Sequence, residues 1–252
     1  MSLAMYEITE AGHRILNGIT DDKLMLIGEV SRIDADTKIL DLACGKGELL
    51  CRYAQEFGSS GVGVDISEIF LPQARARAAE LGVSGKVDFV LGDAATYEAE
   101  PGSYDVVSCI GATWIGGSLV GTLELMRPAV RPDGLLLVGE PYWITPPPEQ
   151  AYEAAGVRPD EYTSLIGTLD RIESAGMDLV EMVQANPDSW DRYYATQWWT
   201  AREWLDQHPG DARASDVLAF ITASRRKFLQ YFRPHLGWAV FVIRPTRPDV
   251  AG

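Results

Sequence analysis

Apolar residues follow two different spacings along the first 140 residues of the chain. Short apolar runs occur at 38–42, 61–65, 87–90, 105–109 and 135–138. Between these runs apolar positions recur at helical spacing, as Leu49, Tyr53 and Phe57 do. The runs are typical of buried strands and the helical spacing of amphipathic helices. Their alternation predicts βαβ units and a parallel sheet.

The remainder of the chain has a different pattern. Three consecutive prolines at 146–148 open a helical stretch at about 149–174, and 177–184 and 236–243 are typical of two more strands. We therefore predict an α/β fold with a doubly wound, seven-stranded, mostly parallel sheet. The whole chain, 1–252, is predicted to be a single domain. Its core lies at about 21–145, 177–185 and 236–245, and its helical cap at about 146–176 and 186–235.

Composition excludes several kinds of partner. Lys and Arg number 22 against 36 for Asp and Glu, which gives a net charge of −14. Such a field repels phosphate backbones and anionic lipid, so we expect no nucleic acid and no membrane as partner. A protein or tRNA substrate that binds through a local basic patch is not excluded.

No apolar run approaches the roughly 18 residues of a membrane helix. The three cysteines, Cys44, Cys51 and Cys109, are expected to be reduced thiols in a cytoplasmic protein.

The segment from Asp41 to Gly47 lies between a predicted strand and a predicted helix. Gly45 and Gly47 let the backbone turn tightly and approach a ligand closely. A dinucleotide loop would need a third glycine where the chain has Leu50. Asp41 would repel a pyrophosphate but attract an ammonium group, and Asp65, at the end of the second strand, is placed to accept ribose hydroxyls. Together these features describe S-adenosyl-L-methionine better than NAD.

Residues 38–140 resemble the class I S-adenosylmethionine-dependent methyltransferases. The matching segments are 41–47, 64–67, 92–94, 104–107 and 131–134. The segments 111–114 and Glu-Pro-Tyr-Trp at 140–143, placed after the fifth strand, also look like a small uncharacterised bacterial subgroup. The resemblance implies the strand order 3-2-1-4-5-7-6 with the last strand antiparallel. It also implies S-adenosyl-L-methionine as cofactor and S-adenosyl-L-homocysteine as product.

The resemblance further implies roles for individual residues. Asp65 would bind the ribose, Asp93 and Ala94 would meet the adenine edge, and residues 109–111 would lie under the cofactor. The full set of expected cofactor-binding residues is Asp41, Ala43, Cys44, Gly45, Gly47, Asp65, Ile66, Asp93, Ala94, Cys109 and Gly111. Ala43 departs from the family, which more often has glycine there. Alanine is tolerated at this position if its φ is negative.

Two residues are candidates for a catalytic base. Glu140 ends the fifth apolar run and is either a group that orients or deprotonates the acceptor, or a carboxylate held by backbone amides. His13 lies on an N-terminal segment that can close over the cofactor, and is either a base or a surface histidine. Three scattered histidines predict no metal site. The aromatic residues expected at the substrate pocket are Trp114, Tyr142, Trp143, Trp190 and Tyr194, with cap core as the alternative for the last two.

The sequence therefore predicts methyl transfer from S-adenosyl-L-methionine to a small, partly apolar metabolite by in-line displacement. Two alternatives remain. A non-catalytic module that binds S-adenosylmethionine or S-adenosylhomocysteine would keep the glycine loop without an acceptor pocket. An NAD(P)-dependent oxidoreductase would share the sheet but need the third glycine. The acceptor atom (O, N, C or S) and the choice between monomer and homodimer are left open.

Overall fold

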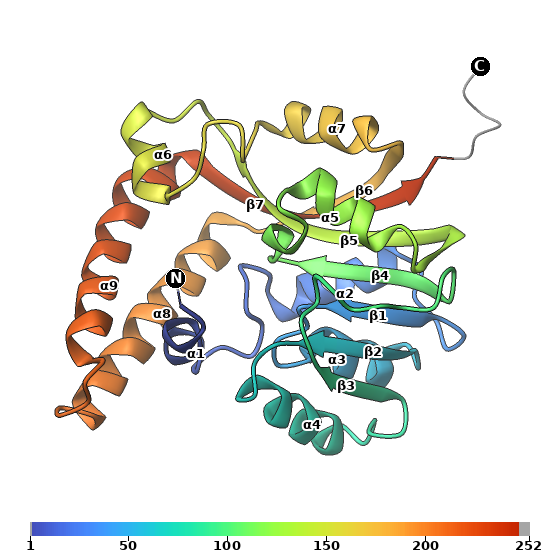
Figure 1. Ribbon diagram of the computed structural model, residues 1–252, viewed down its shortest axis with the longest axis horizontal. Helices are drawn as coiled ribbons and strands as arrows, with labels where there is room; N and C mark the ends of the chain where they lie inside the picture. The colour runs from blue at the N-terminus through green and yellow to red at the C-terminus, as the bar shows by residue number, and fades with distance from the viewer. Residues whose placement is uncertain (1, 247–252) are drawn as a thin grey trace.

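Seven strands form one sheet at the centre of the structure, a computed structural model that describes residues 2–246 (Figure 1). The order across the sheet is β3-β2-β1-β4-β5-β7-β6, with β7 antiparallel to β5 and β6 and the other neighbours parallel. The predicted fold class and strand order are therefore confirmed. The strands are β1 (Lys38–Leu42), β2 (Ser60–Asp65), β3 (Val87–Leu91), β4 (Tyr104–Ile110), β5 (Val130–Trp143), β6 (Met177–Gln184) and β7 (Leu236–Pro245).

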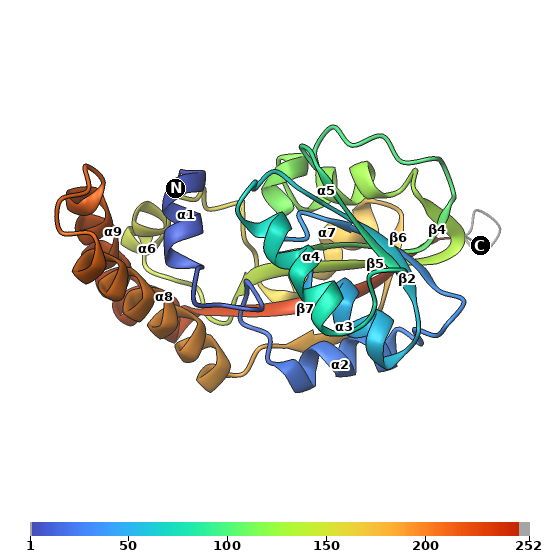
Figure 2. The same ribbon diagram turned by 90° about the horizontal axis from the view of Figure 1, so that it is seen from below.

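Helices cover both faces of the sheet (Figure 2). On one face lie α2 (Asp21–Val30), α3 (Glu48–Glu56) and α4 (Phe70–Glu80), which pack side by side. On the other lie α5 (Leu119–Met126) and α7 (Leu165–Ser174), next to the short 3-10 helix η1 (Thr113–Gly116). The central strands have helices on both sides, so β1 is buried at every residue after Lys38. This explains its near-continuous apolar sequence.

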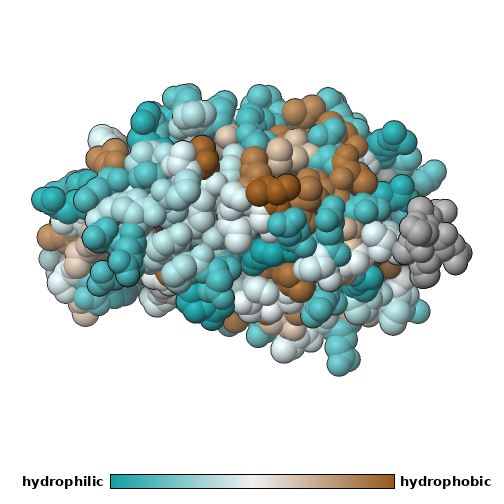
Figure 3. All heavy atoms as spheres, turned by 90° about the horizontal axis from the view of Figure 1, so that it is seen from above, coloured by the Kyte–Doolittle hydropathy of each residue, from teal (hydrophilic) through white to brown (hydrophobic). Residues whose placement is uncertain are grey.

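A further group of helices forms the cap, beside the carboxyl ends of the parallel strands (Figure 1). α1 packs against α8, and α8 and α6 both pack against α9. The rings of Trp190, Phe228 and Phe232 are buried in the same apolar core as Ile27 and Tyr53. Figure 3 shows one face of the cap half, and this face is mainly hydrophilic. The cap consists of α1 (Leu3–Thr9), α6 (Glu149–Ala155), α8 (Pro187–Gln207), α9 (Ala214–Lys227), the π-helical turn η2 (Phe228–Phe232) and α10 (Arg233–His235).

Two elements differ from the predicted pattern. The helix predicted at 149–174 is two helices, and α7 packs against β5, β6 and α5 instead of joining the cap. The Glu-Pro-Tyr-Trp segment lies inside β5 and not after it. The reason is strand pairing, because residues 140–143 pair with 236–239 of β7 and so prolong the strand past its apolar run.

Three chemical features accompany this fold. Cys44, Cys51 and Cys109 are free thiols. In the part of the chain that the structure describes, no group of three or more His, Cys, Asp or Glu side chains is arranged to hold a metal ion. Nor is any described helix both long and apolar enough to cross a bilayer.

Candidate active site

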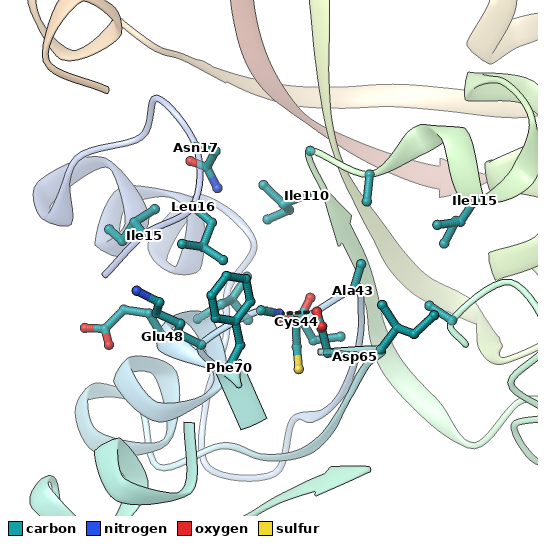
Figure 4. Close-up of a pocket in the computed structure, with 18 of the residues that line it drawn as sticks. Ile15, Leu16, Asn17, Ala43, Cys44, Glu48, Asp65, Phe70, Ile110 and Ile115 are labelled. Carbon is teal, nitrogen blue, oxygen red and sulfur yellow. Dashed lines mark hydrogen bonds between the residues drawn. The ribbon is translucent and has the colours of Figure 1, made fainter. Parts of the chain in front are cut away.

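A cavity of about 760 Å³, here called the cofactor cavity, opens at the carboxyl ends of β1, β2 and β4 (Figure 4). Leu16 and Phe70 reach into it on one side, and Ile110 and Ile115 line the other. The loop after β1 forms part of its wall, with Gly45 at φ +56°. Positive φ favours glycine there. The loop therefore offers bare backbone to a ligand.

Asp41 and Asp65 are two of the buried carboxylates that line this cavity. Asp65 Oδ2 accepts a hydrogen bond from the Gly45 amide at 2.7 Å, and its Oδ1 accepts one from the Ser67 amide at 2.8 Å. Asp41 Oδ1 accepts a hydrogen bond from the Ser108 hydroxyl at 2.7 Å. Burial raises the pKa of both acids, that of Asp41 to about 7, although these hydrogen bonds oppose the rise. Buried carboxylates are costly without partners, so both are ready to accept hydroxyl or ammonium donors.

Ala43 lines the cavity with left-handed backbone, at φ +59°. The condition under which alanine is tolerated at this position, a negative φ, is therefore not met. The loop is held by two hydrogen bonds, from the Cys44 amide to the Val64 carbonyl at 3.0 Å and from the Gly47 amide to the Cys44 carbonyl at 2.9 Å. Left-handed backbone costs an L residue about 1–2 kcal/mol. That cost explains why glycine suits this position.

Most of the residues expected to bind the cofactor do line the cavity: Asp41, Ala43, Cys44, Gly45, Asp65, Ile66, Asp93, Ala94 and Gly111. Gly47 and Cys109 do not. Gly47 is the N-cap of α3, and a Cβ there would lie 2.5 Å from the Phe89 ring. Cys109 is fully buried in the core toward α5, and burial raises the pKa of its thiol. Both shape the site without facing the cavity.

Lys46 has a role that the sequence pattern did not reveal. It is 2% exposed, and its ammonium donates to the backbone carbonyls of Glu10, Ala11 and His13 at 2.8, 2.9 and 2.6 Å. A lysine between two glycines was the only local signal. Lys46 thus ties the N-terminal segment to the cofactor loop.

His13 belongs to the same linkage. Its Nδ1 lies 3.0 Å from Glu10 Oε2, and its Nε2 lies 3.1 Å from the Tyr193 carbonyl oxygen. The other oxygen of Glu10 accepts hydrogen bonds from the Tyr193 hydroxyl at 2.9 Å and from Gln197 at 2.6 Å. His13 Nε2 contacts a backbone carbonyl, Nδ1 lies beside a carboxylate, and the residue does not line the cavity. These contacts favour a structural role over that of a general base.

Glu140 also lies away from the cavity. It is 1% exposed, and its Oε2 accepts a hydrogen bond from the Thr113 hydroxyl. Arg171 of α7 lies 3.7 Å from its Oε1. Burial raises the pKa of Glu140 to about 7, although both neighbours favour its ionised form. The geometry favours a structural role for Glu140. Its carboxylate is held by the side chains of Thr113 and Arg171 and not by backbone amides.

A second cavity, of about 200 Å³, lies between the sheet and the cap, and we call it the aromatic cavity. It shares Leu16, Asn17 and Gly111 with the cofactor cavity. Its other lining residues include six aromatic ones, Tyr162, Trp190, Tyr193, Tyr194, Phe232 and Trp238, together with Pro141, Val157, Lys227 and Leu236. The two cavities therefore adjoin each other.

Three of the five aromatic residues expected at the substrate pocket line one of the two cavities, and the other two line neither. Trp190 and Tyr194 line the aromatic cavity, and Trp114 lines the cofactor cavity. Tyr142 and Trp143 line neither. Successive strand residues point to opposite faces, so with Pro141 at the cavity Tyr142 points into the core toward α5. Trp143 packs edge-on against the rings of Tyr152 and Tyr162, behind the cavity wall.

Comparison with known proteins shows relatives over both the core and the whole chain. The family profile described as "Methyltransferase domain" matches residues 39–134. The uncharacterized protein YjhP of Escherichia coli (strain K12) is 41% identical over 241 residues, which span 95% of this chain and 97% of that protein.

Two crystal structures match nearly the full length. A SAM-dependent methyltransferase from Geobacter sulfurreducens in complex with S-adenosyl-L-homocysteine has a TM-score of 0.93 and 41% identity, and covers 97% of this chain and 98% of its own. Another SAM-dependent methyltransferase, from Thiobacillus denitrificans and with the same ligand, has a TM-score of 0.92 and 39% identity. The match covers 97% of this chain and 99% of that protein. With its confirmed strand order and matching family profile, the chain belongs to the S-adenosylmethionine-dependent methyltransferases and takes S-adenosyl-L-methionine as cofactor.

Proposed function

We propose that this methyltransferase acts on a small, partly apolar metabolite, which binds in the aromatic cavity. The observation that carries the proposal is the junction between the two cavities. Leu16, Asn17 and Gly111 line both, so a molecule in one cavity adjoins a molecule in the other. A space of about 200 Å³ suits one small molecule, and its walls are mostly aromatic and aliphatic.

The cofactor cavity offers the groups that S-adenosyl-L-methionine needs. Asp65 would accept the ribose hydroxyls, Asp41 would face the ammonium group, and Asp93 with Ala94 would meet the adenine edge. When bound, the cofactor supplies a methyl group on a positively charged sulfur, which passes to a nucleophilic atom by in-line displacement. The raised pKa values of Asp41 and Asp65 support this assignment, because donors from a ligand relieve buried carboxylates.

The task of the chain itself is to position the acceptor and to exclude water. At Gly111, φ is +86°, and a Cβ would lie 3.7 Å from Trp238 and 3.9 Å from Asn17, which is within the junction. The glycine therefore keeps the passage between the cavities open. Asn17 Oδ1 accepts a hydrogen bond from the Ile19 amide at 2.9 Å, which orients this side chain at the junction and leaves its NH₂ group for an acceptor. Glu140 and His13 have no role in this proposal, because neither lines a cavity.

The free thiols bear on where the enzyme works. All three cysteines are unpaired, and two of them, Cys51 and Cys109, are buried. We propose a reducing compartment, such as the cytoplasm, where thiols persist.

Filling the aromatic cavity tests the proposal. Val157→Phe adds a ring inside the aromatic cavity and leaves the loop after β1 unchanged. We expect methyl transfer to fall at least tenfold, while the affinity for S-adenosyl-L-homocysteine stays within twofold of wild type. Turnover is measured as S-adenosyl-L-homocysteine released with a small-metabolite extract as acceptor source, and affinity by calorimetry. Val180→Phe, at a 48% exposed position of β6, is the matched control. Full turnover by a folded Val157→Phe enzyme would place the acceptor elsewhere.

A further inference from the structure

Lys227 is the one charged residue among the described residues that line the aromatic cavity. It ends α9 and directly precedes the π-helical turn at 228–232, a feature frequent at functional sites. Its Nζ lies 5.1 Å from the centre of the Phe232 ring. No hydrogen bond or ion pair of this ammonium is present within residues 2–246. The cavity thus holds a cation with an aromatic neighbour and no anion.

Lys46, which is fully buried, offers a comparison for the partly buried Lys227. The ammonium of Lys46 donates to three backbone carbonyls and is thereby satisfied. Lys227 has no such set, and burial lowers its pKa because desolvation disfavours its charge. Removing an ammonium from water costs free energy unless an acceptor replaces the water that it loses. An anion bound in the cavity would supply the acceptor and recover that cost.

The surrounding charges also favour an anion. No Asp or Glu side chain is among the described residues that line the aromatic cavity. The exposed Arg225 and Arg226 precede Lys227, and Arg226 lines an adjoining outer groove of about 280 Å³ that Lys227 also lines. In a chain of net charge −14, this run makes a local positive potential. Such a potential raises the local concentration of anions and speeds their arrival.

We infer that the methyl acceptor is a molecule that carries a carboxylate on a flat apolar body. Lys227 binds the carboxylate, and the body lies between the aromatic walls of the cavity. This inference rests on the proposed function and names its substrate class. A cationic acceptor is disfavoured because Lys227 already lies against Phe232 and none of the lining residues that the structure describes is an acid. A phosphate would bring a charge of about −1.5 to −2, which a single ammonium leaves partly unbalanced. One carboxylate matches one lysine.

A pair of probes of equal shape tests this inference. Benzoate and its neutral analogue benzamide are titrated by calorimetry into protein saturated with S-adenosyl-L-homocysteine. We expect the wild type to bind benzoate about tenfold more tightly than benzamide, as a charge-assisted hydrogen bond provides. Lys227→Met should bring the ratio to about one and leave the affinity for benzamide unchanged. Lys227→Arg should keep a preference for benzoate.

Controls separate this inference from the proposed function. Lys86→Met, at an exposed lysine whose ammonium donates to the Gly58 carbonyl, removes one charge far from the cavity and should leave the ratio unchanged. Unchanged affinity for S-adenosyl-L-homocysteine verifies that each variant is folded. Equal binding of both probes by wild type, or a benzoate preference that survives in Lys227→Met, overturns the role of Lys227. If Val157→Phe then blocks binding of both probes, the aromatic cavity remains the proposed acceptor site, but without a role for Lys227. Failure of both probes to bind the wild type overturns the inference and the acceptor site together.

Discussion

The cofactor cavity and the aromatic cavity adjoin each other but are built in different ways. The acidic groups and the glycine loop of the first, Asp41, Gly45 and Asp65, belong to one βαβ unit. The walls of the second come from distant segments, including Tyr162, Trp190 and Trp238. Backbone turns at strand ends define the first site, whereas packing of the cap against the sheet defines the second. The polar groups that Asp41, Gly45 and Asp65 bring to the cofactor cavity are therefore local to one segment of the chain, whereas the proposed acceptor site depends on the whole fold.

Removing Asp65 should give the largest effect on the cofactor cavity. Asp65→Ala deletes the proposed ribose acceptor and leaves the Gly45 and Ser67 amides without their partner. Hydrogen bonds to a charged group contribute about 1.5–3 kcal/mol each, so we expect about 100-fold weaker binding of S-adenosyl-L-homocysteine. Calorimetry measures this, with Asp88→Ala, at an exposed acid on β3, as control. Unchanged affinity in the Asp65 variant would contradict the ribose assignment.

The raised pKa of Asp41 predicts a pH dependence of cofactor binding. A carboxyl group with a pKa of about 7 is mostly protonated at pH 6 and mostly ionised at pH 8. A ligand ammonium prefers the ionised form, so binding lowers the pKa of Asp41 and affinity rises with pH. We expect about a tenfold gain in affinity for S-adenosyl-L-homocysteine from pH 6 to pH 8. Asp41→Asn should bind more weakly at pH 8 and show a flat profile. A steep profile in that variant would assign the dependence to another group.

The smallest effect concerns the backbone of the cofactor loop. Ala43→Gly relieves left-handed strain of about 1–2 kcal/mol, but glycine costs about 0.5–1 kcal/mol in unfolded-state entropy. The net expectation is a gain of up to about 1 kcal/mol in the free energy of unfolding, measured in urea. Ala78→Gly, a buried position inside α4, should instead lose about 1 kcal/mol. Equal losses in the two variants would mean that Ala43 is unstrained.

The sequence indicated the sheet well because the central strands are buried on both faces, and this burial appears in the sequence as short apolar runs. It missed the full length of β5, since pairing with β7 is a long-range event that apolar spacing does not record. The same limit applies to Glu140 and Tyr142. Both follow the fifth apolar run, but strand alternation turns them toward the face of the sheet that carries η1, α5 and α7, while Pro141 faces the aromatic cavity. A one-residue difference in register decides whether a side chain lies in a site or in the core.

The sequence by itself indicated the cofactor and the family, because Asp41, Gly45 and Asp65 lie at or after strand ends that adjacent segments of the chain create. Tertiary structure alone assembled the aromatic cavity, which is the proposed acceptor site. Lys227 and Trp190 lie in one cavity, and Lys46 reaches the carbonyls of the N-terminal segment, only after the cap has packed on the sheet. Contacts between residues so far apart in the chain depend on the sum of many packing interactions. No local pattern of polar and apolar residues records that sum.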